Sequence, residues 1–140
     1  MKVLFDTNVV IDILMERQPF FKNSYAVLDM VAEKKIFGIV SAGAITDIYY
    51  LIRKEFPNYL YAQNAISDLL KNLFAVDTKA QDIHSALELG FSDFEDAVVS
   101  AVAVRERANF IITRNTKDFA KSSVKAVSPS DFLENYSAFV

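Results

Sequence analysis

Four separate carboxylates of this chain could act together on a metal ion. Asp6 follows the first apolar run of the chain, Asp47 lies within a helical pattern, and Asp96 opens another helical pattern. Asp118 follows the apolar run Phe110–Thr113. Carboxylates gathered in one place repel one another, and a divalent cation is the usual way to offset that repulsion. If the fold brings these side chains together, they offer an oxygen-only site for such a cation.

Each acid also has an explanation that needs no ligand. The segment Asp6–Asn8 contains three good N-cap residue types before an expected helix. Asp47 lies on the flank of an expected core face, where a carboxylate can simply be exposed. Asn115, with Asp118 three residues on, fits the cap of a turn or short helix. The local sequence leaves the structural and the functional interpretations open.

Capping alone explains the segment around Asp96 less well. A capping box formed by Ser92 and Glu95 is expected to start a helix here. Asp93 and Asp96 then lie in its first turn, where the helix dipole favours negative charge. The following residues, Ala97–Val104, are apolar nearly all round, which predicts a buried helix. That helix carries Asp96 toward the interior, and a buried carboxylate needs a partner or a cation.

A parallel sheet covered by helices would bring these positions to one edge. Continuous apolar runs are typical of strands covered on both faces, and they lie at Val3–Phe5, Phe37–Val40, Leu73–Val76, Phe110–Thr113 and Val124–Val127. Helical patterns occupy Val9–Glu16, Phe20–Lys34, Ser41–Phe56, Asn58–Lys71, Thr78–Leu89, Ser92–Arg107 and Ser130–Tyr136. This alternation predicts an α/β protein, a three-layer α/β/α sandwich with a central, mostly parallel sheet of about five strands. Open α/β sheets bind ligands at the carboxyl ends of their strands.

Length and composition narrow the class of protein. With 140 residues, 52% of them hydrophobic, we expect a single domain spanning residues 1–140. No apolar stretch approaches the roughly 18 residues of a membrane span, and the pattern at the N-terminus differs from a signal peptide. We therefore expect a soluble, cytoplasmic protein. Cysteine is absent and His84 is the one histidine, so any metal must be held by oxygen ligands.

Charge is distributed unevenly along the chain. The formal net charge of −3 argues against a protein that coats nucleic acid without specificity. Between Arg105 and Lys125, however, six basic residues stand against two acidic ones, a local charge of +4. This segment is either an ordinary solvated surface or an edge that faces a polyanion.

Taken in order, the motifs resemble the PIN domain. They are Phe5–Asn8 at the start, Asp47, Asp93–Ala97 before an alanine-rich helix, and Thr113–Asn115 with Asp118–Phe119. Each motif is weak alone, whereas the ordered set, which spans Met1 to about Asp131, is specific. The resemblance implies a metal-dependent endoribonuclease that hydrolyses RNA, of the kind found as VapC-type toxins in toxin–antitoxin pairs.

The resemblance also implies which residues form the site. The acids that match the catalytic, metal-binding residues of the family are Asp6, Asp47, Asp96 and Asp118, with Mg²⁺ or Mn²⁺ as the cofactor. Position 47 is often glutamate in the family, so the shorter Asp47 binds the metal either directly or through water. Asn115 stands where many members have aspartate, which increases the importance of Asp118 and of Asp93 as a spare acid.

Neighbouring polar residues are expected to support this site. Thr7 and Asn8 would hydrogen-bond the Asp6 carboxylate or a substrate phosphate. Thr113 would support the acids, and Arg114 and Lys117 would contact the RNA backbone. A bound cation would activate water and polarise the scissile phosphate.

The resemblance further implies partners: an RNA substrate, a cognate antitoxin protein and a second copy of the chain in a homodimer. Aromatic residues are either contact surfaces for such partners or part of the core, and they are Phe20, Phe21, Tyr49, Tyr50, Tyr59 and Tyr61.

The alternative function is a non-catalytic PIN-like module that binds RNA or protein with a degenerate acidic site. A haloacid-dehalogenase-type phosphatase is disfavoured because Asn8 replaces its second aspartate, and a response-regulator receiver because Asp6 stands alone.

Overall fold

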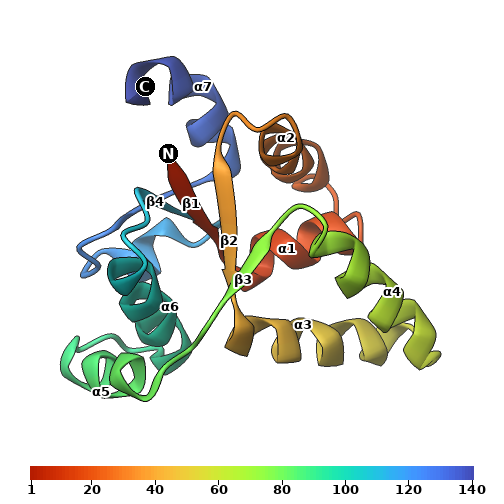
Figure 1. The fold of residues 1–140 in the computed structure, drawn as a ribbon, viewed down its shortest axis with the longest axis horizontal. Coiled ribbons are helices and arrows are strands. Elements are labelled where there is room, and N and C mark those ends of the chain that lie inside the picture. The colour runs from red at the N-terminus through yellow and green to blue at the C-terminus, as the bar shows by residue number, and fades with distance from the viewer.

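The computed structural model describes residues 1–140 as a parallel sheet between two layers of helices (Figure 1). The strands are β1 (Lys2–Phe5), β2 (Phe37–Ser41), β3 (Phe74–Val76), β4 (Phe110–Ile112) and β5 (Lys125–Val127). They lie in the order β3-β2-β1-β4-β5, and every neighbouring pair is parallel. The predicted α/β/α sandwich with a sheet of about five strands is confirmed.

All the predicted helices are present, with bounds that differ by a few residues. They are α1 (Thr7–Leu14), α2 (Phe21–Ala32), α3 (Ala42–Glu55), α4 (Tyr59–Leu69), α5 (Ala80–Glu88), α6 (Phe94–Arg105) and α7 (Pro129–Phe139). A short 3-10 helix, η1 (Thr116–Phe119), follows β4. No helix combines the length and the apolar character needed to cross a membrane.

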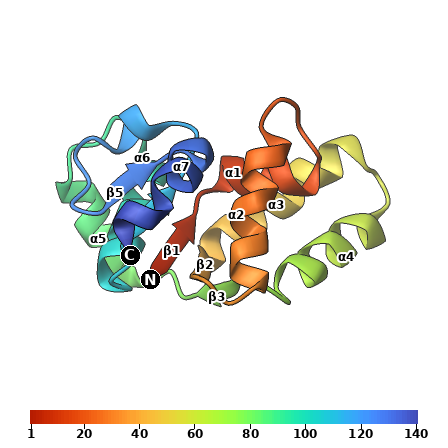
Figure 2. The ribbon, with the colours of Figure 1, turned by 90° about the horizontal axis from the view of Figure 1, so that it is seen from above.

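Alternation along β1 divides the core between the two faces of the sheet. Val3 and Phe5 belong to the larger cluster, which α1, α2 and α7 cover and α3 and α4 extend. Leu4 belongs to the smaller cluster with Val99 and Val102 of α6. Burial of each such side chain contributes roughly 2 kcal/mol to folding. Figures 1 and 2 show α3 and α4 on the side of α1, away from α5 and α6.

The start of α6 corrects one sequence prediction. Asp93, not Ser92, is the N-cap, because the Asp93 carboxylate accepts a hydrogen bond from the backbone N–H of Asp96 at 3.1 Å. The predicted capping box of Ser92 and Glu95 is therefore wrong. Serine and aspartate are both good caps, so adjacent candidates could not be separated by residue type. The helix itself is largely buried, as its apolar sequence predicted.

Candidate active site

Asp6 is fixed at the carboxyl end of β1. Its side chain is nearly buried, with 5% of the residue exposed. One carboxylate oxygen caps α1 by accepting from the Thr7 backbone N–H at 2.9 Å, and the other accepts from the Thr113 hydroxyl at 2.8 Å. The second contact follows from register, since Phe5 pairs with Ile112 in neighbouring parallel strands. The expected N-cap role is present, together with an interaction that a cap does not need.

Asn8 connects the β1–α1 turn to the segment after β4. Its amide nitrogen lies 3.3 Å from the Thr113 hydroxyl and 3.4 Å from the Asp6 carboxylate. Its amide oxygen accepts from the backbone N–H of Arg114 at 3.3 Å. The Asn115 backbone N–H donates to the Thr113 hydroxyl at 3.1 Å, while the Asn115 side chain makes no capping hydrogen bond. These bonds hold Asp6 in one orientation.

The acids around Asp6 interact through their charges. Partial burial first, and then the charges of Asp93, Asp6 and Asp118, raise the pKa of Asp96 to about 7. Burial likewise raises the pKa of Asp6, against the opposing hydrogen bonds from Thr113 and Thr7. Repulsion from Asp93 and Asp118 adds to the rise for Asp6. The fold therefore brings together Asp6, Asp93, Asp96 and Asp118 from three separate segments.

Glu95 is a site residue that the sequence analysis treated only as a helix cap. Its carboxylate lies 3.4 Å from the Thr7 hydroxyl. Burial first, and then the charges of Asp47 and Asp6, raise the pKa of Glu95. The exposed Asp47 therefore faces the cluster from α3 on the side of Glu95. Direct adjacency to Asp96 in the motif is the signal that could have identified Glu95.

The acidic side chains have no basic partner. None of the six ion pairs in the structure includes any of them. Three of them, Asp6, Glu95 and Asp96, line an open cavity of about 240 Å³ together with Thr7, Asn8 and Asn115. Arg17 also lines this cavity, and its ion pair is with Glu55 rather than with any of these acids. Oxygen donors in such surroundings match the preference of Mg²⁺ and Mn²⁺.

The spacing of the acids is looser than that of a formed metal site. No three acidic side chains lie close enough together to bind one ion as they stand. Like charges favour separated side-chain positions when no cation lies between them. The buried Asp6 is held by its hydrogen bonds, so the more exposed acids are the ones free to rotate toward it. The chemistry of the donor set fits a hard divalent cation.

Comparison with known proteins agrees with the fold. A family model described as PIN domain matches residues 2–117. This chain belongs to the PIN domain family. Ribonuclease VapC1 of Aquifex aeolicus (strain VF5) is 26% identical over 140 residues, which cover 96% of this chain and 95% of that protein.

Solved structures share the fold of this PIN domain. VapBC2 from Rickettsia felis, bound to a DNA fragment from its promoter, matches with a TM-score of 0.73 and 18% identity, over 91% of this chain and 98% of that chain. A toxin-antitoxin complex from Klebsiella pneumoniae matches with a TM-score of 0.68 and 23% identity, over 91% of this chain and 97% of that chain.

Arg114, which was predicted to contact the RNA backbone, has an internal partner in this PIN domain. Its guanidinium contacts the carboxylate of Asp12 at 2.6 and 3.3 Å and lies 4.2 Å from the centre of the Phe20 ring. Asp12 is fully buried in α1. Asp12 was not among the predicted site residues, although its place among apolar residues of a helix was a signal. The ion pair anchors the segment that carries Thr113.

The basic segment Arg105–Lys125 also has fewer unpaired positive charges than its sequence indicates. Arg105 pairs with the buried Asp82 at 2.9 Å, and the ammonium of Lys121 donates to the carbonyl of Gly90 at 2.7 Å. With Arg114 also paired, half of the basic side chains have partners inside the domain. The exposed cations that remain are Arg107, Lys117 and Lys125.

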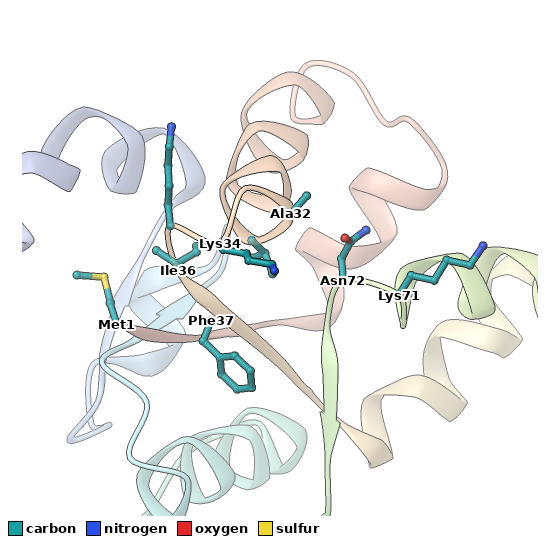
Figure 3. Close-up of a pocket in the computed structure, with 9 residues that line it drawn as sticks. Met1, Ala32, Lys34, Ile36, Phe37, Lys71 and Asn72 are labelled. Atoms are coloured by element: carbon teal, nitrogen blue, oxygen red, sulfur yellow. The ribbon is translucent and has the colours of Figure 1, made fainter.

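A separate hollow, of about 460 Å³, lies where the strands begin, at the end of the sheet opposite to the acids (Figure 3). It surrounds the start of β2 near Phe37, whereas the acids follow the ends of strands. Two of its three lysines have acidic partners: Lys35 pairs with Glu33 at 2.8 Å and Lys71 with Asp68 at 3.0 Å. This hollow is therefore separate from the acidic site.

Proposed function

We propose that this PIN domain is a divalent-metal-dependent endoribonuclease that hydrolyses RNA phosphodiester bonds. The observation that carries the proposal is the acidic cluster without basic partners, in which the pKa of Asp96 rises to about 7. A cation is the simplest way to offset such repulsion. The similarity to a protein named as a ribonuclease supports RNA as the substrate.

Within this proposal, Asp6 and Asp96 bind Mg²⁺ or Mn²⁺, with Asp118 and Asp47 completing the set directly or through water. The ion would supply Lewis-acid chemistry, which activates a water nucleophile and offsets charge on the phosphate. Thr113 and Asn8 orient the Asp6 carboxylate by hydrogen bonding, which is how ligand geometry is usually maintained. Asp96 would hold the cation in its ionised form, since a nearby positive charge favours the carboxylate.

Other neighbours would complete the surroundings of the reacting phosphate. Asn115 lines the cavity as a neutral donor or acceptor, and Asp93 adds negative charge at the start of α6. The exposed Lys117 of η1 is available to the RNA backbone, where lysine contacts phosphates. Arg114 acts indirectly, by holding the segment after β4.

We also propose a toxin role with a protein antitoxin as partner, a homodimeric state and a cytoplasmic location. The support is the likeness to VapC1 and, at the level of fold, to toxin-antitoxin complexes. Exposed aromatic residues offer contact area for protein partners, and they include Phe20, Tyr50, Tyr59 and Tyr61. Co-purification of the chain with the product of its neighbouring gene tests the antitoxin partner.

Replacement of Asp6 by asparagine tests the catalytic proposal. Asparagine is a good N-cap, and its one amide oxygen can still accept from the Thr7 N–H, so the change removes the negative charge and the hydrogen bond accepted from Thr113. We expect Mn²⁺-dependent RNA cleavage to fall by about 100-fold or more, since metal ligands act in every turnover. Asp29→Asn, on an exposed surface of α2, is the matched control and should cleave normally. Cleavage that persists in EDTA, or in Asp6→Asn, would contradict the proposal.

A non-catalytic RNA-binding module is the second candidate. Two observations favour it: Asn115 stands where the motif usually has an acid, and the carboxylates do not form a closed metal site. This function predicts RNA binding without any stabilisation by Mn²⁺. Thermal unfolding with and without Mn²⁺, combined with RNA binding, separates the two candidates.

A further inference from the structure

Another cavity, different from the hollow near Phe37, adjoins the acidic cavity on the side of α6. It has a volume of about 310 Å³, within the range of pockets that take small organic groups. Its walls come from the start of α3, from α5 and from α6, and the small and apolar residues that line it are Gly43, Ala44, Ile83, Phe94, Val98 and Val99. Glu95 lines both cavities, so the two lie next to each other.

The walls of this cavity suit a flat apolar group. Phe94 is the first residue of α6 and leaves 46% of its surface exposed, although it is a large apolar side chain. Gly43 and Ala44 add little side-chain volume to the wall that α3 forms, and a Cβ at Gly43 would lie 3.2 Å from the Thr78 hydroxyl oxygen. An exposed aromatic ring in a cavity that is also lined by small residues is a surface on which a base can stack.

Charge at the rim selects which part of a nucleotide can enter. Asp47 and Glu95 line the cavity, and no basic residue does. Two carboxylates would repel a phosphate but accept hydrogen bonds from the N–H groups of a base. The phosphate therefore belongs with the cation in the acidic cavity, while the neutral part of the nucleotide fits the apolar one.

We infer that the cavity beside Phe94 binds one unpaired base of the RNA, next to the phosphate held at the acidic cluster. This inference rests on the proposed ribonuclease function and adds a stacking subsite to it. Recognition of RNA through unstacked bases is general for single-stranded segments. Phe94 contributes stacking, and Glu95, which faces both cavities, marks the boundary between base and phosphate.

The test measures RNA binding under conditions that prevent cleavage. A fluorescein-labelled single-stranded RNA decamer of mixed sequence is titrated with protein in Ca²⁺, and anisotropy gives the dissociation constant. A second ligand is the same sugar-phosphate chain without bases. The variants are Phe94→Ala and Phe94→Tyr, with Phe74→Ala as control, because Phe74 is an exposed aromatic residue of β3 outside the cavity.

We expect Phe94→Ala to bind the decamer about 10-fold more weakly than the wild type, as stacking of one base predicts. Phe94→Tyr and Phe74→Ala should bind as the wild type does, and all proteins should bind the baseless chain equally. Equal decamer binding by Phe94→Ala and Phe74→Ala would overturn the inference, as would an equal loss on the baseless chain.

Measuring cleavage beside binding separates this inference from the proposed function. If the wild type cleaves RNA in Mn²⁺ but Phe94→Ala binds the decamer normally, only the base subsite is overturned. If the wild type neither binds nor cleaves any RNA, both are overturned. A Phe94→Ala protein with altered sedimentation mass and unchanged RNA binding would show that a second copy covers this surface, which also overturns the base subsite.

Discussion

The Asp96→Asn variant measures how much repulsion among the acidic side chains lowers the free energy of unfolding when no cation is bound. Partial burial and the neighbouring acids raise the pKa of Asp96 from 3.8 to about 7 in the folded protein. At pH values well below 3.8 the carboxyl group is protonated in both states and makes no difference. As the pH rises from about 4 to about 7, the unfolded chain releases this proton while the folded protein retains it. The free energy of unfolding of the wild type therefore falls across that window.

The size of the effect follows from the shift and from exposure to solvent. A change from 3.8 to about 7 corresponds to roughly 4 kcal/mol at about 1.36 kcal/mol per pH unit. Asp96 is only partly buried, so screening by water reduces this figure to about 1–2 kcal/mol. Asparagine also gives up a favourable interaction with the dipole of α6, about 0.5 kcal/mol. We expect Asp96→Asn to be more stable than the wild type by about 1 kcal/mol at pH 8 and equally stable near pH 4.

Urea unfolding followed by circular dichroism gives these free energies between pH 4 and pH 8 in EDTA. Asp29→Asn is the matched control and should follow the wild type at every pH. When Mn²⁺ is added at pH 8, the wild type should gain stability, by about 4 kcal/mol at a thousand times the dissociation constant, and Asp96→Asn should gain less. A variant that is less stable than the wild type at pH 8 without metal, or whose difference is independent of pH, would refute the reasoning.

Two further substitutions test the contacts that hold the site. Thr113→Val removes the hydroxyl that donates to Asp6 and should lower the free energy of unfolding by about 1–2 kcal/mol, whereas Thr113→Ser should stay near the wild type in the same urea titration. Asp12→Asn leaves the guanidinium of Arg114 without its anion and should cost about 2–3 kcal/mol in thermal or urea unfolding. Combining Asp12→Leu with Arg114→Met should cost less than Asp12→Asn alone, and a cost at or above that of the single variant would show that the ion pair is not the cause.

Local sequence was sufficient for the elements and for the individual acids. The continuous apolar runs predicted buried parallel strands because both faces of each strand are covered, and the structure has a strand at each of them. The polar residue types before Thr7 predicted a helix start, and Asp6 is that cap. Such features depend on neighbours along the chain, so a single sequence contains the information for them.

Pairing between distant residues could not be predicted in this way. Arg114 had several acids as candidate partners, and only the register of β1 with β4 brings it to Asp12 across 102 residues of chain. The same packing decides that Glu95 faces both cavities and that Asp47 approaches from the side of Glu95.

The sequence by itself determined the oxygen-only character of the site, since cysteine is absent and the one histidine, His84, lies outside the motifs. It also determined the order of the acidic motifs that is typical of the PIN domain. Only the tertiary structure decided which of the acids lie close enough to raise one another's pKa, which basic residues already have acidic partners, and where an apolar cavity adjoins the acidic cluster. The physical reason is that charge, burial and cavity shape depend on distances in space, whereas sequence periodicity specifies hydrogen bonding and burial within each element.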